Sequence, residues 1–167
     1  MPLTRVARLT VRRTTTAATR TRAITAIIRR FTRATVMERI TLIRGGVPAS
    51  LITTLVDALG LPKQRIARAL GIAVPTLNRK LRDRTPLNTS ESERVVGLAQ
   101  LIDQVDSWAA HVSESAPPDF RASRWLGGWL ATPASALNGH EPLTLLDTAD
   151  GRALVANALR DLTAGAY

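Results

Sequence analysis

The chain has 167 residues, 45% of them hydrophobic, which is enough for one folded domain or two small ones. It contains no cysteine, which excludes disulfides, thiolate nucleophiles and cysteine metal sites. Its formal charge of +10 favours a nucleic-acid partner. Apolar runs fall well short of the roughly 18 residues that a membrane span needs, and β-branched residues do not alternate over long runs. We therefore expect an almost wholly helical, cytoplasmic protein without a membrane partner.

The N-terminal segment carries most of the positive charge. Residues 1–36 contain nine Arg and no acid, whereas residues 85–167 carry five Arg against ten acids. The segment is rich in Thr, Arg and Ala, with no clear helix start or stop signal. We predict that residues 1–36 are a basic disordered arm, or that the true start codon is Met37; an organelle transit peptide is a less favoured alternative.

Three short helices are predicted after an apolar run that ends at Gly45-Gly46. The first begins at Pro48, where a missing N–H costs nothing, and is closed by Gly60. The second runs from Pro62 to Gly71, with Ile66, Ala67 and Leu70 inward. The third begins near Val74-Pro75, with Leu77 and Leu81 inward.

The second and third of these helices have the spacing of a helix-turn-helix. Ala67 is small enough for a close crossing, Gly71 takes the turn, and Ile72 and Leu77 fill the angle. An ordinary αα-corner is the alternative, but a charge of +6 over residues 62–84 favours DNA. Outward polar residues that suit bases and phosphates are predicted to bind DNA: Gln64, Arg65, Thr76, Asn78, Arg79, Lys80 and Arg82.

A long helix is predicted next, beginning at a capping box of Ser90 and Glu93. Apolar residues recur at three- and four-residue spacings from Val95 to Val112, which makes this helix the spine of the domain. Residues 113–119 form a loop by composition, because Pro117-Pro118 bar a helix.

The C-terminal stretch reads as several short helical pieces followed by one longer helix. Thr148 occupies an N-cap position, and Asp150 lies in the first turn, where it favours the positive end of the helix dipole. Val155 and Leu159 belong to one apolar stripe, and Gly165 stops the helix. Such a stretch is too short to bury both faces alone, so it needs the rest of the chain or a partner.

The order W-L-x-T-P-x-x-A-L-x-G-x-x-P-L-x-L-L-x-T-x-x-G-x-x-x-V, from Trp129 to Val155, resembles the toxin-binding domain of Xre/MbcA/ParS-type antitoxins, the partners of RES-domain toxins. The resemblance implies an all-α fold, with an Xre-like helix-turn-helix domain in residues 37–115 and a small helical toxin-binding domain in residues 116–167. In that family the toxin degrades NAD, and the antitoxin covers its active site and represses its own promoter. The toxin-binding residues implied here are Trp129, Leu143, Leu146, Val155, Leu159, Gly165, Ala166 and Tyr167.

Residues for catalysis or metal binding do not come together in the sequence. His111 and His140 have no third ligand in view, and the acids near residue 147 are explained by helix-start positions. We therefore predict no enzyme activity, no metal and no cofactor. The predicted partners are a RES-domain toxin, double-stranded promoter DNA and a second copy of the chain, with a higher toxin–antitoxin complex. The competing hypothesis is a stand-alone helix-turn-helix repressor whose C-terminal domain dimerises or senses a ligand.

Overall fold

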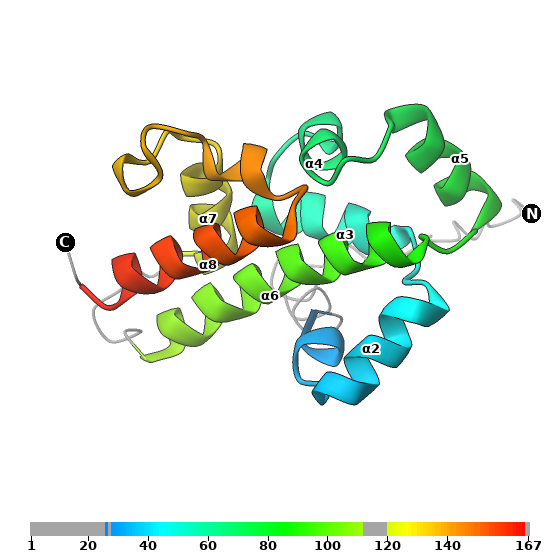
Figure 1. The fold of residues 1–167 in the computed structure, drawn as a ribbon, viewed down its shortest axis with the longest axis horizontal. Coiled ribbons are helices and arrows are strands. Elements are labelled where there is room, and N and C mark those ends of the chain that lie inside the picture. Colours follow the sequence, from blue (N-terminus) through cyan, green and yellow to red (C-terminus); the bar gives the residue numbers. More distant parts are fainter. Residues whose placement is uncertain (1–25, 27, 112–119, 166–167) are drawn as a thin grey trace, which may run out of the picture.

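The computed structural model describes residue 26, residues 28–111 and residues 120–165, and these residues form an all-α fold (Figure 1). Residues 28–32 are helical, and the described part has no strand, only an isolated bridge between Pro48 and Pro86. The predicted fold class is confirmed. The elements that follow are α2 (Val36–Gly45), α3 (Ser50–Leu59), α4 (Lys63–Ala69), α5 (Val74–Asp83), α6 (Thr89–His111), α7 (Ala122–Leu130), the 3-10 helices η1 (Ser135–Leu137) and η2 (Pro142–Leu145), and α8 (Ala149–Thr163).

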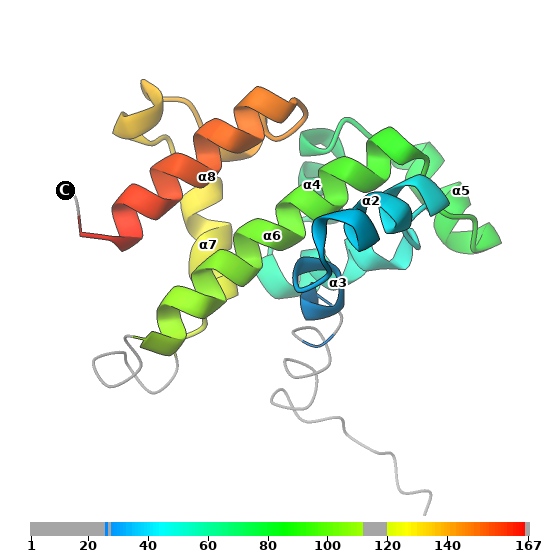
Figure 2. The same cartoon turned by 60° about the horizontal axis from the view of Figure 1, so that its bottom comes forward.

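Helix α6 is the spine of the fold, as its apolar spacing predicts. Its buried stripe includes Val95, Leu98, Ile102 and Val105, and it contacts α2, α3, α7 and α8. In both views α8 runs alongside α6, and α2 lies against another part of α6 (Figures 1 and 2). No helix in the described ranges is long and apolar enough to cross a membrane.

The start of α6 differs from the prediction. The capping box is formed by Asn88 and Glu91: the Glu91 N–H donates to Asn88 Oδ1, and the Asn88 N–H donates to Glu91 Oε2, both at 2.8 Å. The predicted box of Ser90 and Glu93 is therefore wrong. Two overlapping patterns exist in the sequence, and the earlier one is supported by Lys80, whose Nζ lies 3.2 Å from Glu91 Oε2.

The segment ahead of Met37 contains packed residues. Ile28 and Phe31 are 1% and 8% exposed and belong to the hydrophobic core, and Thr35 forms a capping box with Glu38 at the start of α2. The prediction of a disordered arm is thus wrong for residues 28–36, because two apolar residues three apart bury one face of a short helix. Residues 1–25 lie outside the described part of the chain.

One core joins the predicted DNA-binding and toxin-binding segments. Helix α7 packs against both α3 and α6, and a Cβ added to Gly127 of α7 would collide with the carbonyl oxygen of Leu59 in α3. The Trp108 ring of α6 lies 5.8 Å from that of Trp125 in α7, measured between ring centroids. The buried side chains form a single cluster that extends from Ile28 to Leu159. The predicted loop, residues 113–119, lies outside the described residues.

A partly buried acid lies on α6, facing the N-terminal helix. Burial raises the pKa of Asp106, repulsion from Asp103 raises it further, and the charge of Arg29 lowers it. Ionisation of Asp106 is therefore less favourable in the folded protein than in the unfolded chain.

Candidate DNA-binding and toxin-binding surfaces

Helices α4 and α5 form the predicted corner. Ile66, Ala67 and Leu77 are fully buried between them. Gly71 takes the turn with a φ of +60°, where a side chain would be strained, and the Ile72 N–H donates to the Ala67 carbonyl at 2.8 Å. Helix α3, which precedes α4, starts at Ser50, two residues after the predicted start at Pro48.

The outward face of α5 carries some of the predicted DNA-binding residues. Asn78, Arg79 and Arg82 are exposed, and Thr76 is half-buried. The Asn78 Oδ1 atom accepts a hydrogen bond of 2.7 Å from Lys63, and Arg82 pairs with Asp83 at 2.8 Å. Exposed pairs of this kind contribute little to stability, so these groups are free to exchange partners for a ligand.

Two predicted DNA-binding cations are paired with acids of the protein itself. Lys80 has only 17% of its side chain exposed, and its Nζ donates to the Pro86 carbonyl at 3.0 Å as well as pairing with Glu91. Arg65 of α4 pairs at 2.7 Å with Glu141, which lies between η1 and η2. Lys80 therefore serves the fold, and Arg65 joins the helix-turn-helix to the C-terminal segment. Gln64 remains exposed on α4.

Four of the predicted toxin-binding residues lie in the core. Leu143, Leu146, Val155 and Leu159 are at most 3% exposed, so their side chains are not available to a partner. They are buried because the apolar residues whose spacing identifies this domain are the residues that form its core. Trp129 is half-buried and Gly165 is exposed, whereas Ala166 and Tyr167 lie outside the described residues.

The C-terminal segment is held together by contacts that the sequence did not indicate. Arg152 donates to the Leu146 carbonyl at 3.1 Å and pairs with Glu93 of α6 at 3.3 Å, and its Cδ would lie 2.8 Å from a Cβ added to Gly97. Burial lowers the pKa of this guanidinium, while Glu93 raises it. At the start of α8, the Thr148 hydroxyl caps the helix as predicted, accepting from the Gly151 N–H at 3.0 Å.

An exposed stripe runs along α8. Asp150, Leu154, Asn157 and Asp161 are spaced at four, three and four residues, which places them on one helical face. All four are exposed, and Leu154 keeps 50% of its surface accessible. The exposure of Leu154 was not predicted from the sequence. In the sequence, Leu154 comes directly before the apolar stripe of Val155 and Leu159 and is not part of it. This position was the available sign that its side chain is exposed.

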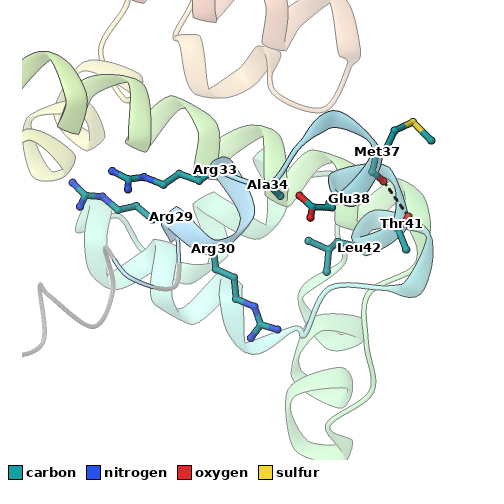
Figure 3. A pocket seen from close by; sticks show the side chains of 8 residues that line it. All are labelled: Arg29, Arg30, Arg33, Ala34, Met37, Glu38, Thr41 and Leu42. Carbon is teal, nitrogen blue, oxygen red and sulfur yellow. Dashed lines mark hydrogen bonds between the residues drawn. The ribbon is translucent and has the colours of Figure 1, made fainter.

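A third surface is a groove of about 660 Å³ between the N-terminal helix and α2 (Figure 3). Glu38 and Leu42 point into its middle, and Met37 points away from it. Helix α2 has no buried residue, and Val36 and Met37 are 63% and 71% exposed. The residues lining the groove are Arg29, Arg30, Arg33, Ala34, Met37, Glu38, Thr41 and Leu42.

No group of three or more His, Cys, Asp or Glu side chains suited to a metal occurs within the described ranges.

Comparisons with known proteins match two parts of the chain. Residues 38–100 match the antitoxin Xre-like helix-turn-helix domain, and residues 120–165 match the antitoxin Xre/MbcA/ParS C-terminal toxin-binding domain. A protein of Sphingobium sp. (strain YBL2), named Prs ADP-ribosylating antitoxin, is 40% identical over 136 residues, which cover 81% of this chain and 84% of that protein. That alignment spans more residues than follow from Met37 on, so the similarity includes residues ahead of Met37. The chain belongs to the Xre/MbcA/ParS family of antitoxins from toxin–antitoxin systems.

Proposed function

We propose that this antitoxin inhibits a RES-domain toxin that consumes NAD, and that it represses its own operon by binding promoter DNA. The observation that carries the proposal is that a toxin-binding domain shares one core with a helix-turn-helix whose outer face carries exposed arginines. The name of the relative refers to ADP-ribosylation. ADP-ribosyl transfer takes its ADP-ribose from NAD and releases nicotinamide, as NAD hydrolysis does, so both chemistries fit an NAD-consuming partner.

The toxin proposal is tested by measuring nicotinamide release by the RES-domain protein of the neighbouring gene. Full-length antitoxin at saturating concentration is expected to stop the release. A chain truncated after Thr163 is expected to fold and to bind the toxin but to inhibit less, because Gly165, Ala166 and Tyr167 would extend past α8 into the active-site entrance. Equal inhibition by both chains would contradict this plug mechanism.

DNA binding is proposed to use the exposed part of α5. Arg79→Ala is expected to weaken binding to all sequences and to reduce the salt dependence by about one unit, as loss of one phosphate contact does. Asn78→Ala is expected to relax sequence preference, at a cost of about 1–3 kcal/mol. The measurement is a salt titration of binding to promoter DNA and to a scrambled duplex. Unchanged binding by Arg79→Ala combined with Arg82→Ala would exclude this face.

A homodimer through α2 is proposed on the basis of its uncovered apolar residues. Met37, Ile40, Thr41 and Arg44 share one face of the helix. If two α2 helices pair antiparallel about a two-fold axis between residues 40 and 41, Met37 lies opposite Arg44 of the partner subunit, whose aliphatic stem can cover it. Glu38 then lies beside the same guanidinium, so opposite charges meet across the axis.

Residues 1–25 are a poorer occupant of this surface, because their six arginines and no acid would meet Arg29, Arg30 and Arg33 in the groove. Met37→Asp is expected to shift the protein from dimer to monomer in sedimentation velocity, with its melting temperature preserved. Leu154→Asp is the matched control, since it places the same charge on another exposed apolar residue. A Met37→Asp protein that remains dimeric would contradict the proposed interface.

A further inference from the structure

Leu154 is the unusual residue of the α8 stripe. Among the described residues of the toxin-binding domain, it is the single large hydrophobic side chain classed as exposed. Full burial of a leucine side chain is worth about 1.5–3 kcal/mol, and half of the Leu154 surface is still in water. No contact within the described part of the fold covers this half of the side chain. A partner that covers it therefore gains the free energy of burying it.

The neighbours of Leu154 on the stripe are acidic. Asp150 lies one turn before it and Asp161 two turns after it, both exposed, and neither has an ion pair within the described ranges. The stripe thus combines one apolar side chain with two carboxylates and with Asn157, whose Oδ1 accepts a hydrogen bond of 2.9 Å from Arg160. Its chemical complement is an apolar pocket bordered by Lys or Arg.

A second copy of the chain does not provide that complement. In an antiparallel pairing of two α8 helices that brings Leu154 opposite Asn157 of the partner subunit, Asp150 lies opposite Asp161 of the partner subunit. In a parallel pairing, each acid lies opposite its own equivalent. Both arrangements bring like charges together, which destabilises the pair. This contrasts with α2, where antiparallel pairing brings Glu38 near an arginine.

We propose that the stripe of Asp150, Leu154, Asn157 and Asp161 is the surface on which the toxin docks, with Leu154 as its anchor. The inference rests on the proposed function, since an enzyme that binds NAD must present cationic or N–H groups to the diphosphate. Carboxylates held on α8 are able to engage such cations at the rim of the cleft. The antitoxin then competes with the substrate for the positive charge that binds it.

The test uses the full-length antitoxin and the purified RES-domain protein of the neighbouring gene, with binding measured by biolayer interferometry at low and high salt. Leu154→Asp is expected to raise Kd at least about tenfold, mainly through faster dissociation, as loss of an interface anchor does. Asp150→Asn combined with Asp161→Asn is expected to slow association and to reduce its salt dependence. Thr53→Asp, at an exposed position of α3 outside the proposed surfaces, is the matched control and is expected to bind the toxin with unchanged Kd.

The outcomes separate this inference from the proposed function. If Leu154→Asp keeps its melting temperature and its affinity for the toxin, the docking surface is wrong, even where the wild-type antitoxin stops nicotinamide release. If the toxin releases no nicotinamide from NAD but binds the wild type at least about tenfold more tightly than Leu154→Asp, the NAD proposal fails and the docking surface stands. If Leu154→Asp changes the sedimentation of the antitoxin alone, the stripe is a contact between copies and the inference is overturned.

Discussion

Gly127 and Gly128 of α7 are adjacent glycines for which the structure predicts opposite effects of the same substitution. A Cβ on Gly127 would collide with the Leu59 carbonyl oxygen and lie 2.9 Å from its carbonyl carbon, whereas a Cβ on Gly128 meets nothing within 4 Å. Replacing Gly by Ala within a helix gains about 0.5–1 kcal/mol of helix propensity. At Gly128 only this gain applies. At Gly127, overpacking against backbone costs about 1–3 kcal/mol, because no flexible side chain is there to move aside.

We therefore expect Gly128→Ala to stabilise the protein by about 0.5–1 kcal/mol and Gly127→Ala to destabilise it by about 1–2 kcal/mol. For a chain of this length, each kcal/mol corresponds to about 2–4 °C in melting temperature. The assay is urea unfolding of the two variants, supported by thermal unfolding. The reasoning would be refuted if Gly127→Ala proved as stabilising as Gly128→Ala, since α7 would then not be packed tightly on α3.

Three further predictions concern groups with specific partners. Phe31→Ala is expected to lower the free energy of unfolding by about 3 kcal/mol, because Phe31 is core; a urea midpoint equal to that of the wild type would contradict its burial. Lys80→Gln is expected to cost about 1–3 kcal/mol by removing the cation that pairs with the largely buried Glu91, and to leave the salt slope of DNA binding unchanged, unlike Arg79→Ala. The pKa of Asp106 is raised in the folded protein. The protonated side chain therefore contributes to stability below the unfolded pKa of about 3.9, and this contribution is lost as the pH rises through the folded pKa. Asp106→Asn should therefore melt above the wild type at neutral pH, and this difference should shrink as the pH falls towards 4; a pH-independent difference would contradict this.

The helices of the fold could be predicted because each depends on a local pattern of residues in the sequence. The Thr148 cap, the glycine at the helix-turn-helix corner and the apolar stripe of α6 all depend on residues a few positions apart. The short helix of residues 28–32 was missed because Ile28 and Phe31 provide only one turn of periodicity within a Thr- and Arg-rich segment. Its burial depends on the rest of the core, which a local pattern does not contain.

The surfaces were harder to predict, because exposure depends on contacts distant in sequence. Lys80 and Arg65 are residue types that commonly bind DNA. In the structure, however, Lys80 pairs with Glu91, and Arg65 pairs with Glu141, 76 residues later in the chain. The leucines that identify the toxin-binding domain are buried for the same reason that their spacing is recognisable. Leu154 lies outside that spacing, and only the structure shows that its side chain is exposed.

The single core also has a thermodynamic consequence for an antitoxin that is proposed to bind both toxin and DNA. When buried side chains from both segments form one cluster, the expected unit of unfolding includes α3, α4, α6, α7 and α8 together. A toxin bound at a free concentration about 100 times its Kd would then add about 2.7 kcal/mol to the free energy of unfolding of the whole unit. Helix α5, which is proposed to contact DNA and joins the cluster through Leu77, would gain the same protection from proteolysis as α8, which is proposed to contact toxin. Release of the toxin would expose both segments to degradation at once.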